Sequence, residues 1–96
     1  MKRLEQSINI FKALGDKTRL SIVYSIMEEA KSVNVIAHEV EMTQSAISHQ
    51  LQILKYNGII KSERKGKEVY YSLDDDHIKF IVQTVENHAS HKIDEQ

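Results

Sequence analysis

Four side chains of the metal-binding type lie in the last quarter of this 96-residue chain, in the segment SLDDDHIKFIVQTVENHASH. They are Asp75, His77, His88 and His91. Carboxylate oxygens and imidazole nitrogens are ligand atoms that suit zinc. The first two residues precede the stretch IKFIVQTVEN and the last two follow it. The residue types and their placement therefore make this segment the first candidate for chemistry.

The stretch between the two pairs has the periodicity of an amphipathic helix. Its apolar stripe is made of Ile78, Ile81, Val82, Val85 and Ala89. On such a helix His77 and His88 project from nearly the same face, but about 16 Å apart along the axis. A zinc–nitrogen bond is only ~2.0–2.1 Å long. One helix therefore cannot bring both imidazoles to one ion.

Two copies of this helix, packed antiparallel along the stripe, remove the difficulty. Asp75 and His77 of one chain then meet His88 and His91 of the other, and two-fold symmetry produces two identical sites. The spacing thus predicts a homodimer and an inter-chain metal site together. The simpler alternative is that the histidines are solvated and that the acidic run 74–76 only caps the helix.

Composition limits the class of protein. We expect one domain, 1–96, with a core small enough to need help from oligomerisation. The chain has no cysteine, which excludes disulfides, a thiolate zinc site and a cysteine nucleophile. No segment resembles a signal peptide or a membrane span, so we expect a cytoplasmic protein with no membrane partner. The net charge of −1 means that any nucleic-acid surface must be local.

Helical periodicity and capping residues predict a helix-turn-helix. A first helix ends at Gly15, and Asp16 caps a second one, DKTRLSIVYSIMEEA. Ser32 opens a short helix, and after a tight turn a recognition helix covers about 43–56 and is closed by Gly58. Ile8, Phe11 and Leu14 have the spacing of the first helix, and Ile47, Leu51 and Leu54 are expected to form the buried stripe of the recognition helix.

Two alternating segments follow, residues 59–63 and 69–73, around Lys65-Gly66-Lys67. They predict a β-hairpin, or wing, at about 59–73, followed by a C-terminal dimerisation and metal helix at about 75–91. The expected fold is therefore mainly α with a small β-hairpin. We interpret it as a winged helix-turn-helix that forms a homodimer through its terminal helices.

The recognition helix and the wing together indicate double-stranded DNA as a partner. The polar residues at the helix N-terminus that suit base edges or phosphates are Thr43, Gln44, Ser45, Ser48 and His49. The bases at the hairpin tip that suit phosphates are Arg64, Lys65 and Lys67. Taken singly, each of these is more often an ordinary solvated side chain.

The segments ALGDKTRLSI and QSAISHQLQILKYNGII, with the order of elements around them, resemble the ArsR/SmtB family of winged-helix repressors over nearly the whole chain. The resemblance implies a homodimer that binds an operator and releases it when a metal binds. One group of the family binds metal through a Cys-x-Cys in the helix before the recognition helix, where this chain has SVNVIAHEV without cysteine. Another group, the CzrA-type zinc and cobalt sensors, uses a carboxylate and three histidines of the paired C-terminal helices. Asp75, His77, His88 and His91 match that pattern.

The expected function is a metal-responsive transcriptional repressor with Zn(II) as its effector, and Co(II) as a second metal that the site would accept. A winged-helix regulator with an organic ligand or with none remains an alternative, as does a purely structural zinc site. An enzyme is disfavoured. Four protein ligands leave no open coordination position, and the chain contains no HExxH motif or nucleophile elbow.

Overall fold

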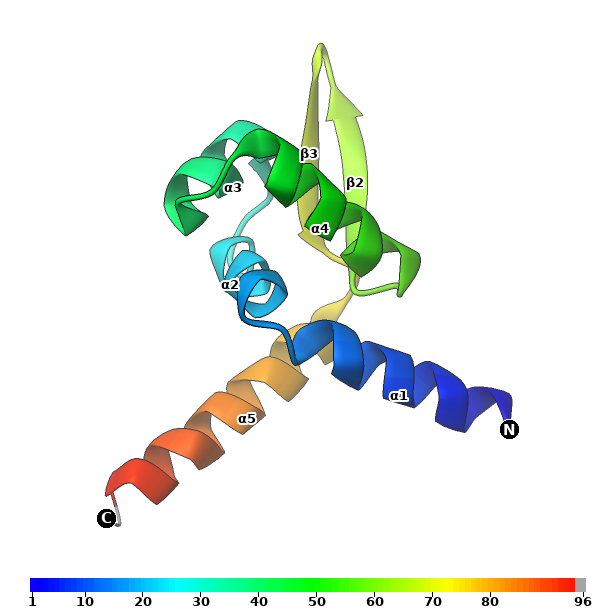
Figure 1. The fold of residues 1–96 in the computed structure, drawn as a ribbon, viewed down its shortest axis with the longest axis vertical. Helices are drawn as coiled ribbons and strands as arrows, with labels where there is room; N and C mark the ends of the chain where they lie inside the picture. The colour runs from blue at the N-terminus through cyan, green and yellow to red at the C-terminus, as the bar shows by residue number, and fades with distance from the viewer. Residues whose placement is uncertain (95–96) are drawn as a thin grey trace.

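The computed structural model describes residues 1–94, and within them the chain forms five helices and three strands. Their order is α1 (Lys2–Leu14), α2 (Lys17–Ser25), β1 (Lys31–Ser32), α3 (Val33–Val40), α4 (Gln44–Tyr56), β2 (Ile60–Lys65), β3 (Glu68–Leu73) and α5 (Asp76–Asp94). The predicted winged helix-turn-helix is confirmed, with α3 and α4 as its two helices and β2 and β3 as its wing (Figure 1).

The wing belongs to a three-stranded antiparallel sheet in the order β1-β3-β2. Ile60 pairs with Leu73 at the base of the hairpin, and Lys65 pairs with Glu68 at its tip. The third strand, β1, was not predicted, because two residues are too few to show an alternating pattern. Its pairing with β3 attaches the start of α3 to the wing.

The core is formed by the end of α1, by α2, α3 and α4, by the base of the wing and by the first turns of α5. The fully buried large side chains are Ile22, Ile26, Ile36, Ile47, Leu51, Leu54, Ile59, Ile60 and Val23. Burial of each such side chain contributes about 1.5–3 kcal/mol. The apolar stripe expected for the recognition helix is thus confirmed, and it fixes which face of α4 points away from the core.

The predicted helix caps are confirmed. The residues whose side chains accept a hydrogen bond from a backbone N–H of the first turn are Asp16, Ser32 and Thr43. After α4, Gly58 has a left-handed conformation (φ 72°), and its N–H donates to the carbonyl of Lys55. Glycine adopts this conformation without steric cost, so it ends the recognition helix and turns the chain into β2.

One helix is shorter than expected. α2 ends at Ser25 and does not continue to Ala30. The chain has to turn there so that Lys31 and Ser32 can pair with β3. Tertiary pairing therefore overrides the helix propensity of the sequence after Ser25.

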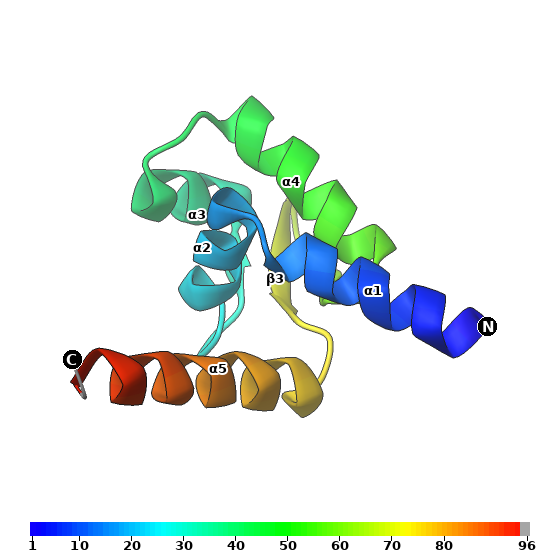
Figure 2. The ribbon, with the colours of Figure 1, turned by 60° about the horizontal axis from the view of Figure 1, so that its bottom comes forward.

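The outer parts of α1 and α5 extend from the body of the molecule toward opposite ends (Figures 1 and 2). Ile78 and Val82 anchor α5 in the core, but other large apolar side chains of α1 and α5 are exposed. These are Leu4, Ile8 and Phe11 on α1 and Phe80, Val85 and Ile93 on α5. The helix predicted from the spacing of Ile8, Phe11 and Leu14 is present, but of these three residues only Leu14 is buried. No helix among residues 1–94 is long and apolar enough to cross a membrane.

Candidate nucleic-acid interface and metal centre

Helix α4 presents its polar residues to solvent. Thr43, Gln44, Ser45, Ser48 and His49 are all exposed. The last four recur at helical spacing, so they lie on one face, opposite the buried apolar stripe. Within residues 1–94 that face is not covered, and the side chains of α4 predicted to contact DNA are therefore accessible together.

The turn between α3 and α4 sets the direction of this face. Glu41, which ends α3, has a left-handed backbone with φ 61°. Its N–H donates to the carbonyl of His38, and the N–H of Met42 donates to that of Ala37. Helices often end with a residue in this left-handed conformation, which is usually glycine, whereas here it is a glutamate. Sequence reasoning missed it, because a glutamate does not signal a left-handed residue.

The three basic residues predicted to cluster at the tip of the wing do not all lie in its turn. Arg64 and Lys65 are the last two residues of β2, and only Lys67 lies in the turn. Successive residues of a strand point to opposite faces, so Arg64 and Lys65 are on opposite sides of the hairpin. The ammonium of Lys65 is 5.6 Å from the centre of the Tyr70 ring, whose hydroxyl donates to Glu68 and thereby has a raised pKa.

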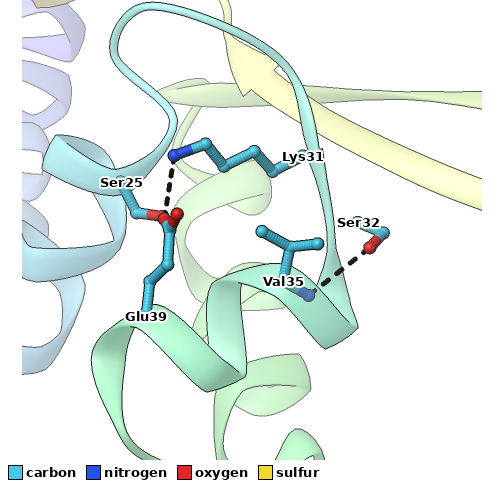
Figure 3. A network of polar contacts seen from close by, with 5 residues as sticks. All are labelled: Ser25, Lys31, Ser32, Val35 and Glu39. Atoms are coloured by element: carbon cyan, nitrogen blue, oxygen red, sulfur yellow. Dashed lines mark hydrogen bonds and ion pairs between the residues drawn. The ribbon is translucent and has the colours of Figure 1, made fainter.

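A polar network fixes α3 against the end of α2 and β1 (Figure 3). The carboxylate of Glu39 accepts a hydrogen bond from Lys31 at 2.8 Å and another from Ser25. The pKa of Glu39 is lowered, first by the bond from Lys31 and then by the bond from Ser25. The cap of α3 by Ser32 lies beside this network. Together these contacts hold the first helix of the helix-turn-helix in position.

Of the four predicted ligands, the structure brings Asp75 and His77 together at the start of α5. One carboxylate oxygen of Asp75 accepts from the backbone N–H of His77 at 2.9 Å, and the other lies 3.3 Å from its Nδ1. The side chain of Asp75 is 47% exposed and that of His77 is 88% exposed. The pair is therefore ordered by a backbone contact and still open to solvent.

His88 and His91 lie on the exposed outer part of α5, and the structure does not bring them to Asp75 and His77. Within residues 1–94 of one chain, no three side chains of histidine, aspartate or glutamate come close enough to hold a metal ion. A site that uses all four residues therefore needs a second chain.

An apolar groove of about 270 Å³ separates the inner parts of α1 and α5. Its lining consists of Phe11, Leu14, Gly15, Leu20, Tyr24, Ile81, Val82 and Val85. The pKa of Tyr24 is raised, mainly by burial and further by its hydrogen bond with Glu86 of α5. An ion pair of 3.2 Å between Lys79 and Glu28 adds a second polar contact between α5 and the body. Sequence reasoning found neither contact.

Comparison with known proteins identifies relatives among DNA-binding regulators. A family model described as "Bacterial regulatory protein, arsR family" matches residues 16–62. The chain is 44% identical over 75 residues to a cadmium resistance transcriptional regulatory protein, a CadC homolog of Staphylococcus aureus, covering 77% of this chain and 62% of that protein. It is 33% identical over 88 residues to a transcriptional repressor SmtB homolog of Synechocystis, covering 92% and 67%. The chain thus spans about two thirds of the length of these relatives or slightly less.

A solved structure matches the fold over almost the whole chain. It is the homodimeric winged helix-turn-helix DNA-binding domain of Mb0332 from Mycobacterium bovis, with a TM-score of 0.94 and 25% identity. The match covers 99% of this chain and 88% of that one. The long outer parts of α1 and α5 are therefore part of the shared architecture.

Proposed function

Because the chain belongs to the arsR family of bacterial regulatory proteins, we propose that it is a cytoplasmic transcriptional repressor that binds operator DNA as a homodimer and releases it when zinc binds. The names of two relatives, a cadmium resistance regulator and a repressor, support the class of function. The observation that carries the metal part of the proposal is the ordered, exposed pair of Asp75 and His77 at the start of α5.

The DNA-binding surface consists of the polar face of α4 and one side of the wing. In this proposal Gln44, Ser45, Ser48 and His49 contact base edges in a major groove, and Thr43 contacts phosphates. Lys67, with either Arg64 or Lys65, supplies positive charge for the adjacent backbone. Hydroxyl and amide groups near a helix N-terminus read bases, whereas the wing strengthens binding without regard to sequence.

The dimer forms through α1 and α5. Six large apolar side chains of these two helices are exposed in one chain, among them Phe11 at 65% and Phe80 at 71%. An exposed apolar surface of this kind marks a protein interface. The solved relative of the same architecture is homodimeric, which supports a second copy as the partner.

The proposed metal site joins Asp75 and His77 of one chain to His88 and His91 of the other. Two ligands of a tetrahedral zinc ion with bonds of ~2.0 Å are about 3.3 Å apart. The distance between the Asp75 oxygen and the Nδ1 of His77 is 3.3 Å, so this half of the site needs little rearrangement. A carboxylate and three imidazoles form a four-coordinate set that suits Zn(II), and Co(II) has similar preferences.

The same four residues connect the two chains, which provides a mechanism for release. They tie the start of one α5 to the outer part of the other, and so restrict how the two subunits are oriented. A dimer reads two successive major grooves, about 34 Å apart, only when its two α4 helices have the matching spacing. A change in the relative orientation of the two α5 helices would therefore alter DNA affinity, although the metal ligands do not contact DNA.

The test is a titration of the dimer with a duplex selected by the protein from a random pool, with and without saturating zinc. We expect selective binding of the apo protein and a loss of affinity with zinc. If zinc strengthens DNA binding, the site is structural and the repressor is not a sensor of this kind. If zinc does not bind while DNA binding stands, the chain is a winged-helix regulator with another ligand or with none.

A further inference from the structure

Arg19 of α2 makes polar contacts with two other helices. Its Nε donates to the carbonyl of Ala13 at 2.9 Å, and one terminal nitrogen lies 3.4 Å from the carbonyl of Lys12. The other terminal nitrogen donates to the side-chain oxygen of Gln50 in α4 at 3.0 Å. One guanidinium therefore joins the end of α1 to the recognition helix.

The contacts with α1 have an ordinary structural explanation. The last carbonyls of a helix lack partners within it, and a positive charge there is favourable. A cap of this kind needs only Ala13 and Lys12. The bond to Gln50 adds nothing to that cap, since it reaches a side chain 31 positions away in another helix. It therefore calls for a separate role.

Gln50 lies at the edge between the two faces of α4. It follows His49 of the polar face directly, and it comes three positions after the buried Ile47. Burial of an apolar stripe is not directional, so it allows a helix to rotate slightly about its axis. A hydrogen bond from a planar guanidinium is directional, and it restricts this rotation.

We propose that Arg19 is a positioning residue for DNA recognition, which acts through Gln50 to fix the rotation of α4 relative to α1. Because α1 belongs to the proposed dimer interface, the hydrogen bond between Arg19 and Gln50 would also fix the orientation of each recognition helix relative to the two-fold axis of the dimer. The inference rests on the proposed DNA-binding function and adds to it a residue outside the DNA surface.

The readout is the ratio of two affinities, for a duplex selected by the wild-type protein from a random pool and for an unselected duplex of the same length. Gln50→Met keeps the size of the side chain and removes the acceptor. We expect the ratio to fall about tenfold, since a hydrogen bond to a charged group is lost. Affinity for the unselected duplex should stay within about twofold, because phosphate contacts are unchanged.

Two further variants distinguish positioning from charge. Gln50→Glu keeps an acceptor for Arg19, so the ratio should stay near the wild-type value even if the new charge weakens both affinities. Arg19→Lys keeps the positive charge but cannot span three acceptors, so the ratio should fall as it does in Gln50→Met. Ile26→Val is the control for stability, since it loosens the core at a buried residue that takes no part in the hydrogen bonds of Arg19.

The outcomes separate the inference from the function on which it rests. An unchanged ratio in Gln50→Met, or an equal fall in Ile26→Val, overturns the positioning role while DNA recognition stands. If the wild-type protein selects no duplex at all, the proposed function fails and the inference fails with it. A fall in Gln50→Met and Arg19→Lys, with a retained ratio in Gln50→Glu, supports it.

Discussion

At the scale of single residues, the two halves of the proposed metal site differ in how the chain prepares them. Asp75 is ordered by the backbone N–H of His77, so the first half exists before any metal arrives. His88 and His91 lie one turn apart on the exposed surface of α5, away from Asp75 and His77. A site of all four residues would therefore join an ordered pair to two ligands of a second chain.

The ligand assignment predicts a specific pattern in mixed dimers. His77→Ala or His88→Ala alone should damage both sites of the homodimer, because each site takes residues from both chains. A mixed dimer of one His77→Ala chain and one His88→Ala chain should regain one intact site, and zinc titration should then give half the wild-type stoichiometry. His38→Ala, which changes an exposed histidine of α3, is the control and should bind zinc normally. Wild-type zinc affinity in the His77→Ala homodimer would refute the inter-chain site.

Glu39 makes the stability of the fold depend on pH. Its pKa is lowered in the folded protein by Lys31 and Ser25. The contribution is therefore fully present above the unfolded-state pKa of about 4.3, and it is lost as pH falls through the lower folded-state pKa. Glu39→Gln should be less stable than the wild type at pH 7, and this difference should shrink below about pH 4. Thermal unfolding of both proteins between pH 7 and 3 measures it, and a difference independent of pH would contradict the assignment.

Residue identity alone could predict which side chains are suitable for metal or DNA, but it could not predict most of their partners. Asp75 and His77 are close in sequence, and their contact follows from a helix start. The bond from Arg19 to Gln50 joins residues 31 positions apart, and only the packing of α2 against α4 brings them together. The same holds for Lys79 and Glu28, which are 51 positions apart.

At the scale of elements, local signals placed the helices that begin with a capping side chain and end with glycine. Asp16, Thr43 and Gly58 were assigned correctly because their roles depend on the nearest few residues. The end of α2 and the strand β1 depend on pairing with β3, about 40 positions later, and were not predictable from local pattern.

The ending of α3 gives a test at this scale. Glu41 has a left-handed backbone, which is unfavourable for a residue with a Cβ atom. Glu41→Gly should therefore stabilise the fold by about 0.5–1 kcal/mol in denaturant unfolding. Asn34→Gly, within the same helix, is the matched control and should be destabilising by roughly 0.3 kcal/mol, the difference between the helix propensities of Gly and Asn. Destabilisation by Glu41→Gly would show that its side chain makes a contribution larger than the backbone strain.

The wing predicts a difference between neighbouring basic residues. Arg64 and Lys65 point to opposite faces of the hairpin, so only one of them can face DNA together with α4. Lys67→Ala and one of the two substitutions Arg64→Ala and Lys65→Ala should each reduce the salt dependence of DNA binding by about one counterion. The other substitution should leave it unchanged. Equal effects of Arg64→Ala and Lys65→Ala would contradict this docking of the wing.

At the scale of the whole molecule, a single chain leaves large apolar side chains of its first and last helices exposed. The apolar pattern of α1 and α5 is correct as a pattern, yet Ile8, Phe11 and Val85 stay exposed in one chain. Apolar periodicity predicts which face of a helix is apolar. It does not predict whether that face packs against the same chain or against a second copy. The apolar groove between α1 and α5 is lined by residues of both helices. It is therefore a surface that a second copy of the chain could cover.

In the proposed dimer, zinc binding at α5 and DNA binding by α4 should weaken each other. Asp75→Ala and His91→Ala should leave the DNA affinity of the metal-free protein nearly unchanged, because neither residue lies on the proposed DNA surface. They should abolish the loss of affinity that zinc causes in the wild type. Operator DNA must also weaken zinc binding by the same factor, typically ~1–3 kcal/mol in such couplings, whereas a nearly complete switch needs about 5 kcal/mol. Four DNA affinities, of the wild type and of His91→Ala, each with and without saturating zinc, test the first two statements, and the zinc affinity of the wild type with and without operator DNA tests the third. If zinc lowers the DNA affinity of His91→Ala as much as that of the wild type, these four residues are not the ligands through which zinc acts.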